Sequence, residues 1–145
     1  MQKFQIKDSS KHGLGVFAKM DIKKGEIIER CAYIVIDDDD LKDDNRLNDY
    51  LFTSPDCSTD YLVMMGAGML FNHGTPGNCE WEIDQNDNRF VVFKAMSNIK
   101  AGSEILHDYG EEYWQTRDVD AVKKNSSGFC PKFHPQVFSI WLPFR

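Results

Sequence analysis

The 145-residue sequence has no apolar run long enough to cross a bilayer, which takes about 20 residues. Its first ten residues are polar and lack the apolar stretch of a signal peptide. It also lacks an excess of positive charge, because 23 acidic residues outnumber 17 basic ones and leave a formal net charge of −6. These absences predict an intracellular, cytoplasmic protein with no membrane partner. They argue against direct nucleic-acid binding, which usually needs a basic face.

Cysteine is scarce and shows no metal-binding or redox spacing. The four cysteines stand at Cys31, Cys57, Cys79 and Cys130, and none of them forms a C-x-x-C pair. Cys130 and His134 supply only half a metal site, and no second half is visible in the sequence. We therefore expect no metal, and free thiols in a reducing compartment.

Short runs of β-branched and aromatic residues, separated by glycine-containing turns, predict a mostly β domain with minor helix. The segments Trp81–Asp84 and Arg89–Phe93 flank a polar linker and predict a β-hairpin. The segment Tyr61–Met65 is compatible with either strand or helix. Four apolar positions after an aspartate run are spaced for one face of a short helix: Leu41, Leu47, Leu51 and Phe52.

Three stretches carry the candidate chemistry. The first is the glycine turn Lys11–Gly15, which lacks the third glycine and the following helix of a dinucleotide loop. The second is Asn72-His73 in a loop rich in glycine and proline, where no nucleophile stands in a hydrolase frame. The third is the segment Glu104–Gly110, which ends in Asp-Tyr-Gly. Each stretch taken alone is also compatible with an ordinary turn.

Taken together, the three stretches resemble the SET-domain family of protein lysine methyltransferases, in its compact stand-alone bacterial and viral form. The order and spacing of Gly13-Leu14-Gly15, Asn72-His73 and Glu104–Gly110 match the family pattern, and Asn78 follows the Asn-His pair at the family's distance. The resemblance covers roughly residues 4 to 114. It implies small β-sheets with a C-terminal pseudoknot, and an S-adenosylmethionine-dependent enzyme that methylates lysine ε-amines of a basic protein or peptide, such as a histone-like tail.

The resemblance also implies roles for individual residues. Tyr109 is expected to be catalytic, at the point where the methyl donor and the amine meet. The substrate channel is expected to be lined by Phe71, His107 and Tyr109. The residues expected to contact the cofactor are Lys11, His12, Gly13, Leu14, Gly15, Asn72, His73, Tyr109 and Trp114.

The sequence departs from the family pattern at three places. Gly77 stands where the family has proline, Cys31 falls near a usual tyrosine, and His107 replaces a tyrosine or phenylalanine that influences how many methyl groups are added. These departures keep open a second interpretation, a catalytically weak SET-like module that binds a basic peptide. A third is a structural β protein without a ligand.

The composition of the chain changes after residue 115, and we therefore expect a SET domain at residues 1–115 and a flank at residues 116–145. The flank is polar and then aromatic, and it contains no cysteine-rich zinc module. Because exposed aromatic residues favour association, we expect the flank to pack on the domain near the substrate channel. A homodimer that completes a substrate groove is an open alternative, as is nuclear localisation if the substrate is a eukaryotic histone.

Overall fold

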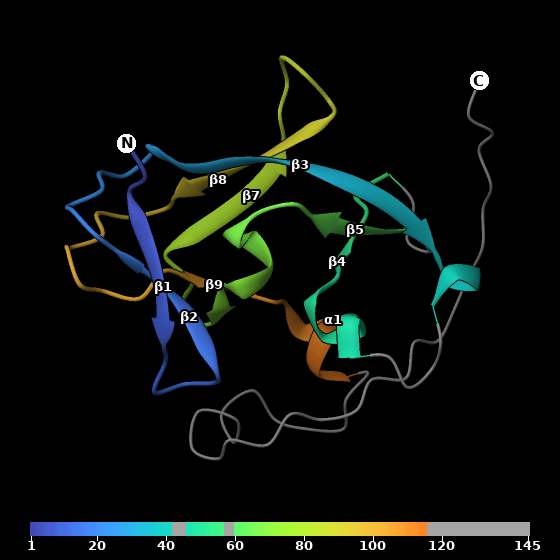
Figure 1. Cartoon of the computed structure of the whole chain (residues 1–145), viewed down its shortest axis with the longest axis horizontal. Coiled ribbons are helices and arrows are strands. Elements are labelled where there is room, and N and C mark those ends of the chain that lie inside the picture. The colour runs from blue at the N-terminus through green and yellow to red at the C-terminus, as the bar shows by residue number, and fades with distance from the viewer. Residues whose placement is uncertain (42–45, 57–59, 116–145) are drawn as a thin grey trace.

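The structure is a computed structural model that describes residues 1–41, 46–56 and 60–115 (Figure 1). The flank at residues 116–145, with Cys130 and His134, and the residue Cys57 lie outside this described part. The elements are, in chain order, β1 (Phe4–Asp8), β2 (Leu14–Ala18), β3 (Ile27–Asp37), the 3-10 helices η1 (Asp38–Asp40) and η2 (Arg46–Tyr50), β4 (Phe52–Thr53), β5 (Asp60–Met64), the 3-10 helix η3 (Ala67–Leu70), β6 (Asn72–His73), β7 (Cys79–Ile83), β8 (Phe90–Ala95), β9 (Leu106–His107) and the helix α1 (Glu111–Gln115). This confirms the expected mostly β fold with minor helix.

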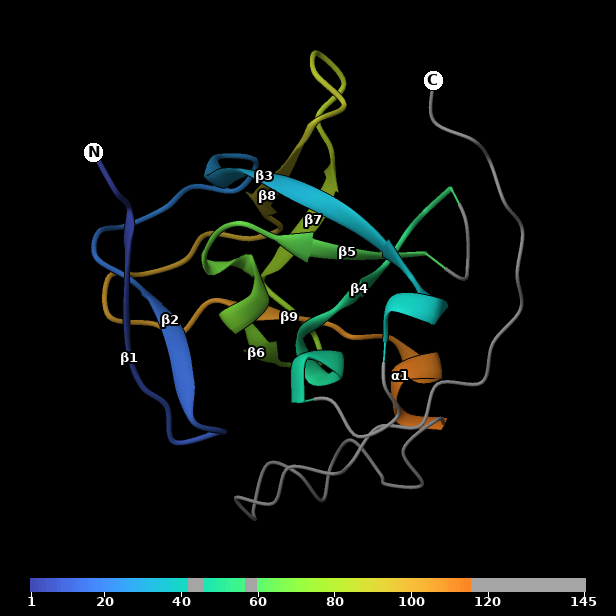
Figure 2. The same ribbon diagram turned by 45° about the vertical axis from the view of Figure 1, so that its right-hand side comes forward.

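The strands form a two-stranded sheet, β1-β2, and a seven-stranded sheet in the order β4-β5-β3-β8-β7-β9-β6. The long strand β3 joins the halves of the larger sheet, because one end pairs with β8 and the other with β5. Figure 2 shows β3 running below the tip of the β7–β8 hairpin, with β6 and β9 lower than β3. No helix in the described part of the chain is long and apolar enough to span a membrane.

The expected hairpin is confirmed, since β7 and β8 pair antiparallel from Cys79 opposite Ala95 to Ile83 opposite Val91. The ambiguous segment that follows residue 60 is a strand. The single amphipathic helix expected around Leu41 to Phe52 is wrong in part: Leu47 lies in η2, but Phe52 begins strand β4. The ring of Phe52 packs edge-on against the Trp81 and Phe93 rings, so tertiary packing outweighs the helical spacing.

The core lies between the two sheets and η3. Val16 of β2, Val91 and Phe93 of β8, and Ile105 before β9 are all fully buried. Two turns of similar sequence are joined beside this core, because Ile22 and Ile99 exchange both backbone hydrogen bonds at 2.8 Å. These bonds hold the turn before β3 against the turn before β9.

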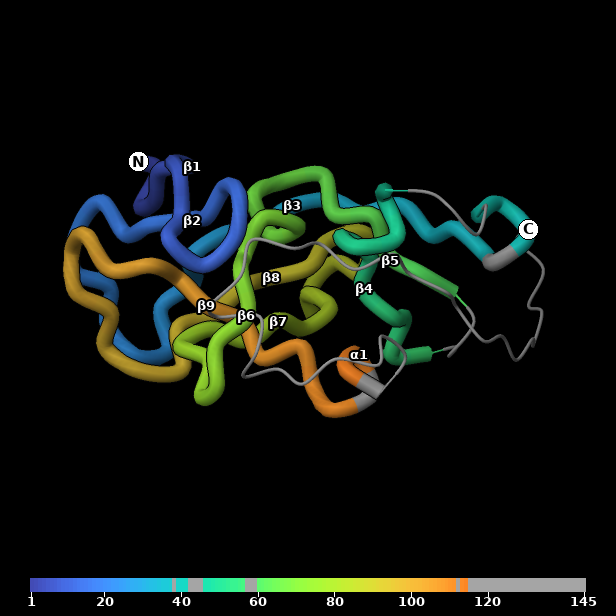
Figure 3. Tube along the Cα trace, turned by 90° about the horizontal axis from the view of Figure 1, so that it is seen from below, coloured from blue at the N-terminus to red at the C-terminus, as the bar shows by residue number. Residues whose placement is uncertain are grey.

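The last strand threads into the sheet rather than adding to its edge. Strand β9 pairs in parallel with β6, Asn72 opposite Leu106 and His73 opposite His107, and it touches β7 on its other side. Figure 3 shows β6 and β9 lying side by side in the middle of the molecule. This is the pseudoknot-like arrangement expected from the sequence.

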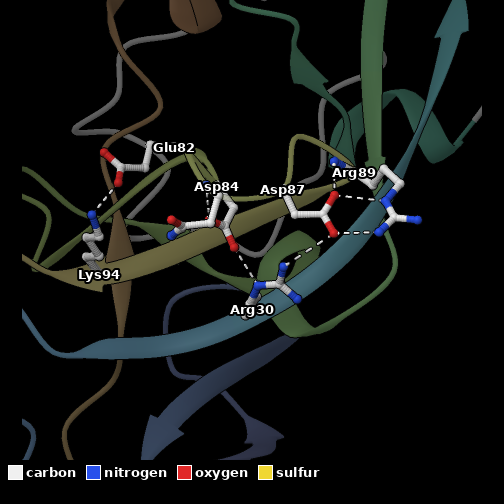
Figure 4. A network of polar contacts seen from close by, with 7 residues as sticks. Arg30, Glu82, Asp84, Asp87, Arg89 and Lys94 are labelled. Carbon is white, nitrogen blue, oxygen red and sulfur yellow. Dashed lines mark hydrogen bonds and ion pairs between the residues drawn. The ribbon is translucent and has the colours of Figure 1, made fainter.

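A polar network ties the β7–β8 hairpin to β3 (Figure 4). Arg30 of β3 donates from Nε to the Asp84 carboxylate at 2.5 Å, and its guanidinium lies 3.6 Å from the centre of the Phe90 ring. Asp84 is 8% exposed and its pKa is lowered, chiefly by the Arg30 hydrogen bond. Arg89 instead pairs with Asp87, two residues away, on the exposed tip of the hairpin.

We expect Arg30→Met to lower the thermal midpoint at pH 7, because it removes the charged partner of Asp84. A carboxylate with a lowered pKa stabilises the fold above its unfolded pKa of about 3.9 and loses that effect as pH falls through the folded pKa. The difference in thermal midpoint between wild type and variant, measured by circular dichroism, should therefore shrink below about pH 3.9. Arg89→Met is the matched control, and its midpoint should stay near wild type because an exposed local pair contributes little. An equal decrease of the thermal midpoint in both variants would contradict a special role for the Arg30–Asp84 pair.

A second prediction concerns the core beneath the site. Ile105 is fully buried, so Ile105→Val should cost about 1 kcal/mol of unfolding free energy and Ile105→Ala about 2–5 kcal/mol. Urea denaturation measures both values. A cost below 1 kcal/mol for the alanine variant would show that the segment before β9 is not firmly packed.

Candidate active site

The three sequence stretches meet around the side-chain amide of Asn72. Asn72 opens β6 and is 8% exposed. Its Nδ2 donates to the carbonyls of His12 and Leu14, both at 3.1 Å, and to Glu104 Oε1 at 2.8 Å. One buried amide thus joins the glycine turn and the segment before β9 to the middle of the chain.

Acceptors outnumber hydrogens at this point. Three oxygens face the Asn72 nitrogen, which carries only two hydrogens, and each carbonyl keeps a second lone pair. A Cβ on Gly15 would overlap the Glu104 carboxylate, so only glycine lets the backbone come this close. The spare acceptor capacity suits a ligand that carries a cationic amine.

Local hydrogen bonds to Ser9 fix the conformation of the glycine turn. Ser9 N donates to Gly13 O at 2.8 Å, and Lys11 N donates to Ser9 Oγ at 3.0 Å. Gly13 has a φ of +44°, a left-handed conformation that favours glycine. The turn places the carbonyls of His12 and Leu14 toward Asn72, so these two carbonyls form one edge of the site.

Tyr109 is fixed at both ends. Its hydroxyl donates to the carbonyl of Phe71 at 2.7 Å, and its backbone N–H donates to Nδ1 of His73 at 3.3 Å. It stands two residues after the end of β9, so the parallel pairing of β6 and β9 carries it to the Asn-His segment. The structure thus brings Tyr109 together with His73 of that motif and with Phe71 just before it.

Phe71 contributes its backbone to the site and its ring to the core. The residue is 2% exposed, and its ring meets the Phe93 ring edge-on at 4.8 Å between centroids. Its carbonyl accepts the Tyr109 hydroxyl. Its expected place in the substrate channel therefore depends on this oxygen rather than on the aromatic ring.

His107 lies among aromatic rings, 5.7 Å from the Phe52 centroid and 5.9 Å from that of Tyr109. Burial lowers the pKa of its imidazole to about 4, although Asp108 acts in the opposite direction. The ring is therefore neutral at physiological pH. Its Nδ1 is buried and has no hydrogen-bond partner among the described residues. That leaves one polar atom available in an otherwise aromatic setting.

Trp114 and Tyr113 of α1 complete an aromatic cluster. The Trp114 ring lies 4.9 Å from the centroid of His73 and stacks on Tyr109 at 6.4 Å with 13° between planes. Tyr113 meets Tyr109 edge-on at 4.6 Å. The expected cofactor residue Trp114 thus lies beside the Asn-His segment, and Tyr113 is a neighbour that was not among the expected site residues.

Glu104 and Asn78 were not among the expected site residues, yet both build the site. Asn78 donates from Nδ2 to Glu104 O at 2.9 Å and accepts from Leu106 N at 2.8 Å. Its amide therefore makes two strand-like bonds to the chain entering β9, while the Glu104 side chain accepts from Asn72. Both residues belong to stretches that carry the family resemblance, Asn78 after the Asn-His pair and Glu104 at the start of Glu104–Gly110. This was the signal in the sequence that could have identified them as site residues.

The thiol of Cys31, which falls near a position where the family usually has tyrosine, is expected to be unreactive. Cys31 is buried, and desolvation followed by the charge of Glu29 raises the pKa of its thiol to about 12. Cys79 is likewise buried with a pKa raised to about 12. Both thiols stay protonated at physiological pH, which makes them poor nucleophiles. Within the described ranges, no group of three His, Cys, Asp or Glu side chains is placed to hold a metal ion.

Comparison with known proteins agrees with this geometry. The family described as the SET domain matches residues 13–110. A Schizosaccharomyces pombe histone-lysine N-methyltransferase, named as specific for lysine 37 of histone H3, is 26% identical over 84% of this chain and 83% of its own length. The Xenopus laevis N-lysine methyltransferase KMT5A-A is 26% identical over 78% of this chain but only 38% of its own length.

The fold comparison points the same way. A solved Plasmodium falciparum structure, described as a candidate histone methyltransferase, superposes with a TM-score of 0.64 at 34% identity and covers 79% of this chain and 98% of that one. The matched family region begins at the glycine turn and ends at the glycine that follows Tyr109, and so contains Asn72 and both strands of the parallel pair. This chain belongs to the SET-domain family.

Proposed function

We propose that this protein transfers a methyl group from S-adenosylmethionine to the ε-amine of a lysine in a basic protein, with a histone tail as the leading candidate. The enzyme class, protein-lysine N-methyltransferase, follows from the family and from relatives that carry this name. The observation that carries the proposal is the position of Tyr109, whose hydroxyl is held on the Phe71 carbonyl where the three motifs meet.

The cofactor would be held on the side of the site formed by the glycine turn. The carbonyls of His12 and Leu14 and the carboxylate of Glu104 offer acceptors for its ammonium group, as the excess of acceptors around Asn72 suggests. Trp114, next to His73, offers an aromatic face for its adenine ring. When bound, the cofactor supplies an activated methyl group on a sulfonium, so no metal is needed.

The protein's own contribution is to desolvate and orient the lysine amine. A lysine with a pKa of about 10.4 must lose its proton before it can attack. The rings of Phe52 and Tyr109 and the neutral imidazole of His107 surround it with few charges, which lowers the pKa of the amine. The Tyr109 oxygen, fixed by Phe71, then helps to align the amine with the methyl group.

The acidic balance of the chain supports a basic substrate. The formal net charge of −6 attracts Lys-rich segments over the range of the Debye length. The names of the relatives include a histone H3 lysine, which makes a histone tail the first substrate to test. The competing interpretation, a module that binds a basic peptide without turnover, predicts cofactor binding with no methyl transfer.

Tyr109→Phe should lower kcat on the order of 100-fold, because it removes one positioned polar group and keeps the ring. The assay is transfer of labelled methyl from S-adenosylmethionine to a panel of histones and lysate proteins. Tyr113→Phe is the control, since its ring touches Tyr109 but its hydroxyl has no proposed role. Full activity in Tyr109→Phe would refute the assignment. Calorimetric cofactor binding by the wild type without any transfer would favour the binding module.

His107→Phe should raise the share of di- and trimethylated product, because it replaces a polar ring nitrogen that can hold a water or the amine with an apolar edge. Mass spectrometry of the modified peptide measures the product ratio. Since the pKa of His107 is about 4, its charge does not change between pH 6 and 9. The wild-type ratio should therefore be constant over that range, and a ratio that varies with pH would point to a different titrating group.

A further inference from the structure

The hydrogen bonds of His73 determine which ring nitrogen carries its proton. Nδ1 accepts the backbone N–H of Tyr109 at 3.3 Å, so Nδ1 is unprotonated. A neutral imidazole has one N–H, which must then be on Nε2. That nitrogen lies 2.9 Å from Oγ1 of Thr75, so Nε2–H donates to the hydroxyl oxygen.

The ring is held in a setting that keeps it neutral. The His73 side chain is 9% exposed, and its ring contacts those of Tyr109 and Trp114, at centroid distances of 5.3 and 4.9 Å. Burial lowers the pKa of His73 below 6.5, with Lys11 adding to the effect and Asp108 opposing it. The lone pair on Nδ1 therefore stays available to the backbone of Tyr109 at neutral pH.

We propose that Thr75 is a positioning residue for Tyr109 and acts through the imidazole of His73. The hydroxyl of Thr75 holds Nε2–H on one side of the ring, which keeps Nδ1 directed at the Tyr109 N–H on the other. The Phe71 carbonyl holds the Tyr109 hydroxyl independently. The backbone N–H of Tyr109 is thus anchored by His73 of β6, and its hydroxyl by Phe71, which lies between η3 and β6.

Thr75 differs from the other residues of the site because its side chain is exposed and touches none of the proposed ligand positions in the described contacts. A change there can alter the orientation of His73 without removing any ligand contact of Thr75 itself. The catalytic part of this inference rests on the proposed methyl transfer, whereas its structural part does not.

The test compares Thr75→Val, which keeps the shape of the side chain and removes the hydroxyl, with Thr75→Ser, which keeps the hydroxyl. The full-length chain is labelled with nitrogen-15, and nuclear magnetic resonance follows hydrogen exchange of the Tyr109 amide and of His73 Nε2–H. Methyl transfer to a histone panel is measured in parallel, with kcat and KM for S-adenosylmethionine determined separately.

In Thr75→Val we expect the His73 Nε2 proton to exchange rapidly and the Tyr109 amide to lose about fivefold protection, the factor that corresponds to one neutral hydrogen bond. We expect kcat to fall by a similar factor, and KM for the cofactor to change less than kcat because Thr75 itself makes no ligand contact. Thr75→Ser should restore all three quantities to within twofold of wild type.

Unchanged Tyr109 exchange in a folded Thr75→Val protein would overturn the proposal. Equal losses in the valine and serine variants would also overturn it, because they would assign the effect to packing of the threonine methyl group. If the wild type transfers no methyl group to any substrate, the proposed function fails. The exchange data then still decide whether Thr75 positions Tyr109 through His73.

Discussion

The site depends on one buried side-chain amide. Asn72 binds the carbonyls of His12 and Leu14, about sixty residues earlier, and the carboxylate of Glu104, 32 residues later. A buried amide donor without an acceptor is costly, so the folded state needs all three segments at this point. The glycine at position 15 follows from this constraint, because any side chain there would occupy the space of the Glu104 carboxylate.

The strands that carry the site are too short to hold themselves in place. β6 and β9 have two residues each, and a parallel pair of that length has few ladder hydrogen bonds. The amide of Asn78 supplies the missing bonds, since it donates to Glu104 O and accepts from Leu106 N. Side-chain amides thus do for this threaded segment what backbone ladders do for β3 and its neighbours.

Charge is distributed unevenly across the site. The acceptor-rich end around Asn72 and Glu104 suits a cation, whereas at the other end burial among the Phe52 and Tyr109 rings lowers the pKa of His107 to about 4. A neutral aromatic end is what an attacking lysine amine requires, because it must shed its proton before reaction. The same fold therefore separates a place for positive charge from a place where charge is disfavoured.

The sequence by itself determined the family, the mostly β class, the hairpin and the three motifs, because glycine turns, alternation and polar spacing act over a few residues. It did not determine that Phe52 forms a strand, that the Phe71 ring turns into the core, or that Asn78 bonds to the chain entering β9. These features depend on contacts between segments far apart in the chain. Only the tertiary structure decided the tautomer of His73, since the protonation of its ring follows from partners at Tyr109 and Thr75 rather than from its own position in the sequence.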